Sequence, residues 1–182
     1  MSTLNNSKQK KSNRLKLFEL ILCTLFGSLM VCSKEIMAIF PNVHLLGLFI
    51  MLATVLFRFK ALISIYIFVF LDGFIWGFST WWIPYLYIWT VLWGITMLIP
   101  KRLPTWAKAA LYPTICALHG FGYGILYAPS QAFFFGLDFD GMVAWVITGF
   151  PYDIIHGISN FCVGFSILPL SILMEKALKK IK

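Results

Sequence analysis

Long apolar runs, separated by short polar or basic breaks, follow one another along almost the whole chain. The runs lie at about residues 16–38, 44–57, 61–78, 85–99, 106–127 and 151–174. Most of them approach the ~20 residues that an α-helix needs to cross a bilayer. The pattern therefore predicts an all-α integral membrane protein with six transmembrane helices in one bundle.

The stretch 128–149 interrupts this regularity. Its apolar pieces, Phe133–Gly136 and Met142–Thr148, are separated by Asp138 and Asp140. Because neither piece is long enough to span, we expect a loop with a short interfacial or re-entrant helix before the last span. An additional span here would also place the C-terminal lysines outside.

Basic residues set the expected orientation. With six spans and the N-terminus inside, fourteen of the fifteen Lys and Arg residues fall on the inner side, and Lys34 is the exception. Such an excess marks the cytoplasmic side of a membrane protein, so both termini are predicted to be cytoplasmic. Residues 1–14 are polar and basic and are expected to form a disordered tail, which leaves 15–182 as a single six-helix membrane domain.

Composition supports the membrane assignment. Hydrophobic residues make up 60% of the chain and charged residues 12%, about half of the ~25% usual in soluble domains. The net charge of +8 would suit nucleic acid, but the basic residues flank apolar runs, so no nucleic acid is expected. The four cysteines lie inside apolar runs without a Cys-x-x-Cys pair, which predicts neither a disulfide nor a metal site.

Ionisable and amide side chains are scarce within the predicted spans. They are Asp72, His119, Asp153, His156 and Asn160. The last three are spaced by three and four residues, so one face of a helix carries all of them. At 1.5 Å of rise per residue, all five lie in the outer half of the bundle. Such side chains mark ligand pathways in membranes, which predicts a polar pocket opening outward; the alternative is hydrogen bonding that only fixes helix packing.

The last of these runs begins with Phe150–Asn160. We expect Pro151 in the first turn of the final helix, where its missing N–H costs nothing, and Asp153 near the positive end of the helix dipole. Aromatic residues gather near the outer ends of spans three to five, and four of them are candidate pocket walls that would stack on a flat ring. These are Trp76, Trp82, Tyr85 and Tyr123. An aromatic belt at the membrane surface is the alternative.

Small residues recur at four-residue spacing on the first span. Cys23 pairs with Gly27, and Thr24 pairs with Ser28. Such faces permit close contact between helices, either within the bundle or with a partner.

Catalytic motifs are missing from the sequence. No Gly-x-Ser-x-Gly, His-Glu-x-x-His or nucleotide-binding loop occurs, so we expect no enzymatic activity and no cofactor. The pair His119 and His156 leaves open an integral membrane haem protein or enzyme. A structural membrane partner without a ligand is a third possibility.

Three stretches resemble the substrate-binding S components of the energy-coupling factor (ECF) vitamin importers of prokaryotes. They are Ser33–Ile36 continuing through Pro41–Gly47, Trp82–Tyr87, and Phe150–Asn160. The last is similar to the Pro-x-Asp/Asn-x-x-His/Lys opening of the final helix in that family, and the resemblance in length and spans covers the whole chain.

The resemblance implies a multi-pass protein of the prokaryotic cell membrane that binds a vitamin near its outer side. It also implies a membrane T subunit and two ATPase subunits as partners. In that family an Ala-x-x-x-Ala face on the first helix docks the T subunit; here the face would be Cys23 and Gly27, or Thr24 and Ser28, without the alanines. Cobalamin is the first expectation for the ligand, with folate, thiamine, riboflavin, pantothenate, and pyrimidine or queuosine precursors open.

Overall fold

The computed structural model describes the backbone over residues 2–40 and 42–181 and the side chains over 17–40 and 42–180, and every element within these ranges is helical. The prediction of an all-α chain is confirmed for this part. The α-helices are α1 (Ser2–Ile36), α2 (Leu46–Phe57), α3 (Ala61–Trp76), α4 (Tyr85–Leu98), α5 (Thr105–Phe121), α6 (Tyr123–Phe135), α7 (Phe139–Gly164) and α8 (Ile167–Ile181). Two 3₁₀ turns, η1 (Met37–Ile39) and η2 (Arg58–Lys60), follow α1 and α2.

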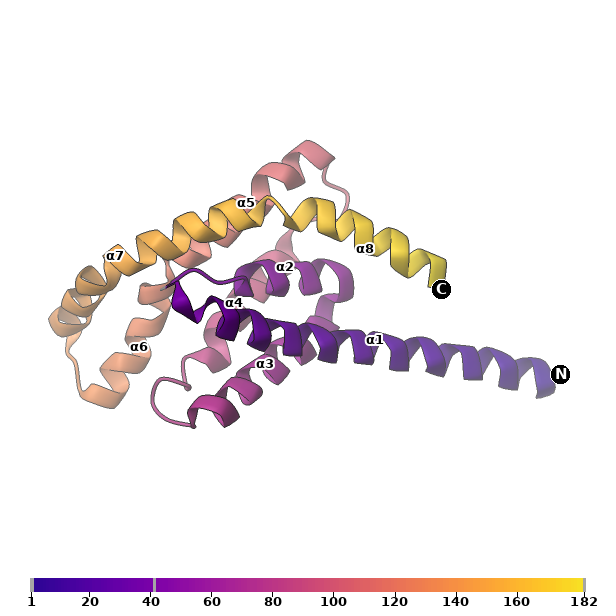
Figure 1. Ribbon diagram of the computed structural model, residues 1–182, viewed down its shortest axis with the longest axis horizontal. Helices are drawn as coiled ribbons and strands as arrows, with labels where there is room; N and C mark the ends of the chain where they lie inside the picture. The colour runs from indigo at the N-terminus through magenta and orange to yellow at the C-terminus, as the bar shows by residue number, and fades with distance from the viewer. Residues whose placement is uncertain (1, 41, 182) are drawn as a thin grey trace.

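The helices form an elongated bundle with both chain ends on one side (Figure 1). We call this side the terminal end; it also carries the turn at 58–60 and the loop at 99–104. The opposite side, the distal end, carries the end of α1, the loop at 77–84 and the turn between α6 and α7. Residues 2–14, for which the sequence predicts a disordered tail, lie in α1, which continues to Ile36.

Three helical stretches are long and apolar enough to cross a membrane, or four if a bent pair counts as one span. They are Leu17–Ile39, Leu46–Trp76 and Thr105–Phe135, with the pair Phe139–Gly164 and Ile167–Lys180, bent by 43°, as the fourth. Helix α4, at 14 residues, is shorter. These lengths indicate a membrane protein with three to four candidate spans, where the sequence predicts six.

The stretch Leu46–Trp76 contains a sharp break at Arg58. This residue adopts φ of 55°, a left-handed value that side chains rarely take. The Arg58 guanidinium donates to the Met97 carbonyl oxygen (2.9 Å), and the Arg58 carbonyl accepts from Trp93 Nε1 (3.2 Å). These bonds hold the strained turn against α4, and the two helices on either side of it contact each other.

The structure corrects the prediction for 128–149 and for the start of the last span. Helix α6 runs through Phe135, and α7 begins at Phe139, so Pro151 lies inside α7 and not in its first turn. Gly136, with φ of 65°, ends α6, and the Asp138 carboxylate accepts from Gly141 N (2.8 Å) at the start of α7. A left-handed glycine and an aspartate cap are the usual stop and start signals of helices; they turn the expected loop into a tight hairpin.

Glycines bring α5 and α7 into backbone contact, which is the most extensive helix pairing in the described chain. A Cβ added to Gly120 would lie 2.8 Å from Gly157 Cα and 2.9 Å from the His156 carbonyl oxygen. A Cβ on Gly164 would lie 2.5 Å from Pro113 Cα. Because backbone atoms cannot move aside as a side chain can, these two positions require glycine.

Gly120→Ala should therefore lower the stability of the purified chain by about 1–3 kcal/mol, the usual cost of overpacking. Gly94→Ala on α4 is the matched control, since a Cβ there meets nothing within 4 Å and alanine favours a helix by up to about 1 kcal/mol. Thermal unfolding in detergent measures both variants. Equal midpoints for the two would contradict the packing of α5 against α7.

Candidate functional site

Four aromatic rings from four segments form a closed cycle in the middle of the bundle. His44 lies 4.4 Å from His156 between ring centroids, and His156 lies 5.1 Å from Tyr123. Trp89 completes the cycle at 5.8 Å from Tyr123 and 6.2 Å from His44. The rings come from the segment before α2, from α4, from the first residue of α6 and from α7.

Two further rings extend this cycle. His119 on α5 lies 5.7 Å from Trp89, and Tyr85, one turn before Trp89 on α4, lies 5.4 Å from it. All three histidines of the chain are thus in one group of rings, which we call the histidine–aromatic cluster. Its members are His44, Tyr85, Trp89, His119, Tyr123 and His156.

Several polar atoms in and beside the cluster are buried without a hydrogen-bond partner in the described protein. They are His44 Nδ1, Trp89 Nε1, His119 Nδ1, His156 Nε2 and Asn160 Oδ1. Trp89, His119, His156 and Asn160 are each less than 5% exposed. An unpaired buried polar group costs about 1–3 kcal/mol, so a molecule that pairs with several of these atoms gains binding energy from each.

Asn160 and His119 each use one of their polar atoms on the backbone. Asn160 Nδ2 donates to the Cys116 carbonyl oxygen (3.2 Å), and His119 Nε2 lies 3.1 Å from the Ile88 carbonyl oxygen. These contacts fix both side chains and direct their second polar atom, Asn160 Oδ1 and His119 Nδ1, elsewhere. The side chains are therefore held in place with one hydrogen-bonding atom still available.

Asp153 lies on the same face of α7 but binds the backbone. Its carboxylate accepts from Gly124 N (3.0 Å), and a Cβ on Gly124 would lie 2.3 Å from the same oxygen. The spacing of Asp153, His156 and Asn160 places all three on one buried face, as predicted. The first of them joins α7 to α6, while the other two belong with the cluster.

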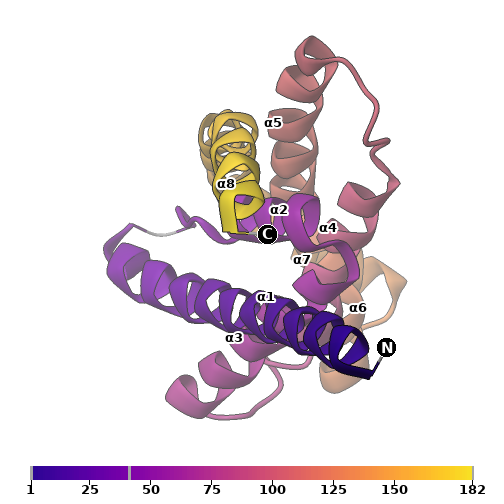
Figure 2. The same cartoon turned by 90° about the vertical axis from the view of Figure 1, so that its right-hand side faces the viewer.

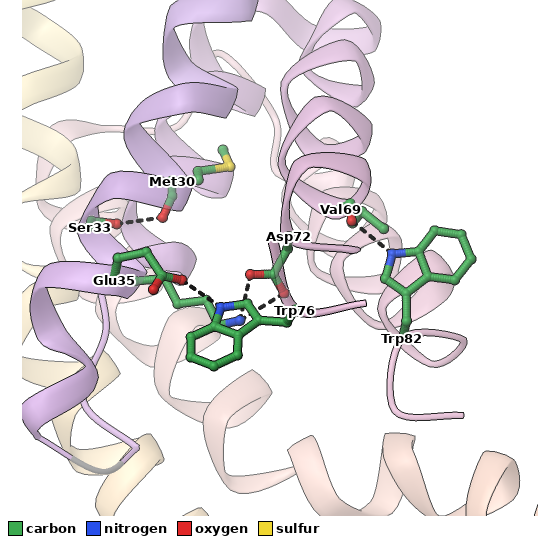
Figure 3. Close-up of polar contacts among 8 residues, drawn as sticks. Met30, Ser33, Glu35, Val69, Asp72, Trp76 and Trp82 are labelled. Atoms are coloured by element: carbon green, nitrogen blue, oxygen red, sulfur yellow. Dashed lines mark hydrogen bonds and ion pairs between the residues drawn. The ribbon is translucent and has the colours of Figure 1, made fainter. Parts of the chain in front are cut away.

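Asp72 is fully buried and forms an ion pair with Lys34. The Lys34 ammonium lies 2.6 Å and 2.7 Å from the two Asp72 oxygens, which joins α1 to α3 (Figure 3). The same ammonium lies 5.6 Å from the ring centroids of Trp81 and Tyr85. Through Tyr85 the ion pair borders the histidine–aromatic cluster.

Trp76 and Trp82 have their indole nitrogens occupied. Trp76 is exposed and donates to Glu35 Oε1 (2.8 Å), whereas Trp82 donates to the Val69 carbonyl oxygen (2.8 Å), as Figure 3 shows. Of the nine predicted site residues, the structure thus brings five together: Tyr85, His119, Tyr123, His156 and Asn160. Asp72, Trp76, Trp82 and Asp153 lie around them and bind other parts of the protein.

Sequence reasoning overlooked His44, Trp89 and Lys34 as site residues. His44 lies at the start of the predicted apolar run 44–57, and in the structure it contacts His156. The signal that could have identified His44 was composition, because the chain has three histidines and two of them were already candidate site residues. Trp89 follows Tyr85 by four residues, a spacing that places both on one helical face.

A cavity of about 210 Å³ lies beside the cluster at the distal end. Its wall is formed by the end of α1, by η1 and by the segment that follows, and His44 belongs to it. Lys34, Glu35 and Trp76 line it as well. His44 therefore contacts both the cavity and the buried cluster, through its own ring and that of His156.

Burial, assisted by the nearby His119, lowers the pKa of His44 from its ordinary 6.5 to about 4. At neutral pH the ring is uncharged and offers one donor and one acceptor.

Each histidine of the haem alternative packs against an aromatic ring. Among the described residues no group of three or more His, Cys, Asp or Glu side chains has the geometry to hold a metal ion. His119 packs against Trp89 and His156 against Tyr123, and these two aromatic rings contact each other. An iron ion held by both histidines would require these rings to move.

The two small-residue faces of α1 differ in exposure. Cys23 is buried, and a Cβ on Gly27 would lie 2.8 Å from the Ser64 carbonyl oxygen, so this face packs against α3. Thr24 is exposed and Ser28 partly exposed, with their hydroxyls bonded to carbonyls of α1 itself. Of the two faces expected to dock a partner, the one with Thr24 and Ser28 is open.

Comparison of the chain with protein-family models, with curated proteins and with solved structures finds no match in any of the three.

Removing Lys34 and removing Asp72 should lower the stability of the folded chain by different amounts. Lys34→Met leaves a fully buried carboxylate unpaired and should cost about 3–5 kcal/mol of stability, whereas Asp72→Asn leaves a partly exposed ammonium and should cost less. The double variant Lys34→Met/Asp72→Asn should recover most of the loss, because no buried charge is then left unpaired. Thermal unfolding of the three variants measures the coupling, with Trp76→Phe as a control that removes an exposed bond; additive effects would contradict the pair.

The lowered pKa of His44 predicts that the folded chain loses stability on acidification. Below pH 6.5 the unfolded chain binds a proton at His44 that the folded chain, with its pKa of about 4, does not bind. Stability should therefore fall as the pH drops from 6.5 to 4, by at most about 3 kcal/mol from this group. His44→Gln should lessen the fall in unfolding midpoint between pH 7 and pH 4.5; identical pH profiles for variant and wild type would refute the assignment.

Proposed function

We propose that the chain is the substrate-binding S component of an ECF-type importer in a prokaryotic cell membrane. It captures a vitamin or vitamin precursor at the distal end, has no catalytic activity of its own, and delivers the ligand together with a T subunit and two ATPase subunits. The observation that carries the proposal is the set of buried, unpartnered polar atoms of His44, Trp89, His119, His156 and Asn160 among aromatic rings.

Six membrane crossings with both termini inside are part of the proposal. The break at Arg58 supports counting α2 and α3 as two crossings, and α4 supplies a further short one. The two chain ends lie on the same side (Figure 1). The basic turn at 58–60 and the basic loop at 99–104 lie there too, in agreement with the preference of Lys and Arg for the cytoplasmic side.

The chemistry of the cluster favours a flat ring with a polar edge. Aromatic side chains stack on such rings, and the unpartnered nitrogens and amide oxygen can pair with groups on the edge. The cavity of about 210 Å³ is smaller than the ~300–1,000 Å³ of most ligand pockets. A vitamin with one or two rings therefore requires less rearrangement than cobalamin, the first candidate from the family resemblance.

The open face of α1 is the docking surface that we propose for the T subunit. Thr24 and Ser28 supply its small residues, and large apolar side chains flank them on the exposed side of the helix: Leu17, Leu20, Ile21, Leu25 and Leu29. Cys23 and Gly27 are already used in packing against α3.

His156→Ala should weaken ligand binding at least tenfold without loss of expression, because it removes a ring and a hydrogen-bonding atom from the cluster. The measurement is quenching of tryptophan fluorescence in the purified chain by riboflavin, thiamine, folate, pantothenate and cobalamin, after mass spectrometry of the small molecules released from wild type. Thr148→Ala is the control, since it lies on the exposed side of the same helix. Equal affinities for the two variants would count against the site.

The released molecules also discriminate the competing functions. A vitamin-like compound supports capture. A visible absorption band from the purified chain would instead support a membrane haem protein that uses His119 and His156. A preparation that neither releases nor binds any compound of the panel would support a structural membrane protein.

A further inference from the structure

A second cavity, of about 380 Å³, lies at the terminal end and is separate from the histidine–aromatic cluster. It is lined by the last turns of α2 and α4, the first half of α5 and the first half of α8. Figure 2, which looks onto this end, shows α8 beside α5 with α2 next to both, and the residue contacts of α8 with α2 and α5 agree.

Charged side chains of this cavity are mainly basic. Arg58, Lys101 and Lys108 line it together with one acid, Glu175, so the balance is three positive charges to one negative. Among the described side chains no ion pair within 4 Å joins Glu175 to any of these three. The cavity wall therefore has a positive charge that its own residues do not neutralise.

Two of the three basic side chains are held in place by backbone carbonyls. The Arg58 guanidinium donates to the Met97 oxygen and the Lys108 ammonium to the Lys101 oxygen, both at 2.9 Å. The hydroxyls of Thr96 and Ser171 donate to carbonyls of their own helices. The cations thus keep free donors toward the cavity, since an ammonium has three N–H groups and a guanidinium five.

The rest of the wall is aliphatic except for the buried Tyr112 of α5. The aliphatic part consists of Val55, Leu56, Ile99, Pro100, Leu168 and Ile172. A cavity that combines fixed cations with a hydrocarbon wall at the end of membrane-spanning helices matches the two parts of a phospholipid. Basic pockets between helices on the cytoplasmic side bind anionic headgroups in this way.

We propose that this cavity binds a phosphate anion, with an anionic phospholipid as its source. The phosphate oxygens accept from Arg58, Lys101 and Lys108, and an acyl chain lies along the aliphatic wall. Lys101 belongs to the α4–α5 connection, Lys108 to the first turn of α5 and Arg58 to the α2–α3 turn, so a bound lipid joins three segments that meet at this cavity. This inference does not depend on the function proposed for the distal site.

The test uses the full-length chain, purified in detergent and freed of lipid. It is titrated with dioleoylphosphatidylglycerol, with dioleoylphosphatidylcholine, which has the same phosphate with a compensating ammonium, and with inorganic phosphate. Native mass spectrometry counts bound lipid, and thermal unfolding reports stabilisation. Each cation near a membrane surface contributes roughly fivefold in affinity for an anionic lipid. Lys101→Gln/Lys108→Gln should therefore weaken phosphatidylglycerol binding roughly twentyfold or more.

Two further variants make the result specific. Lys176→Gln/Lys179→Gln removes the same charge from the exposed side of α8, outside the cavity wall, and should leave binding within about twofold of wild type. Glu175→Gln removes the acid of the wall and should strengthen binding by roughly fivefold. Because Glu175 is exposed, this variant is expected to fold normally.

Preferential binding of phosphatidylglycerol that follows this order of variants supports the lipid source. Displacement of phosphatidylglycerol by millimolar inorganic phosphate, with the same order of variants, supports the anion site but assigns it to a soluble phosphate. Equal binding of the two lipids, or equal losses in the cavity and control double variants, overturns the proposal.

Discussion

The contact between the backbones of α5 and α7 is the constraint on which the candidate site depends. Gly120 and Gly157 leave room for the two helices to touch, and a single added methyl group at Gly120 would meet backbone atoms at under 3 Å. His119 precedes one glycine and His156 the other. The close approach therefore brings two polar side chains from distant parts of the sequence into one buried group of rings, where α4 and the segment before α2 add Trp89 and His44.

The apolar runs located most helices, because a bilayer-length hydrophobic stretch is a strong and local signal. The predictions that the structure corrects concern two positions where a local helix signal, and not the hydropathy of the segment, decides where a helix begins. Asp138 looked like a charge that breaks a span, yet its carboxylate caps α7. Pro151 looked like a helix start, yet α7 begins twelve residues earlier and passes through it. Neither a cap nor an internal proline can be recognised from hydropathy.

Candidate site residues could be predicted where their residue type is rare within the apolar runs. Histidine and asparagine within apolar runs are few, and His119 on α5 and His156 on α7 do join one cluster, through the rings of Trp89 and Tyr123. Their partners were not predictable, because pairing across helices depends on the turns between them. Asp72 was expected to face a ligand and instead pairs with Lys34, while Asp153 binds a backbone N–H of α6. Spacing along a helix gives a shared face, but it does not say which neighbour fills the space opposite.

Pro151 makes local opening of α7 easier. Its ring nitrogen carries no hydrogen, so the carbonyl of Ile147 has no amide donor one turn later and the helical ladder lacks one rung at that level. Local opening of α7 therefore costs less at this level than in the rest of the helix, because one backbone hydrogen bond fewer has to break. Amides of α7 close to Pro151 are therefore expected to exchange with deuterium sooner than those at the contact between Gly120 and Gly157.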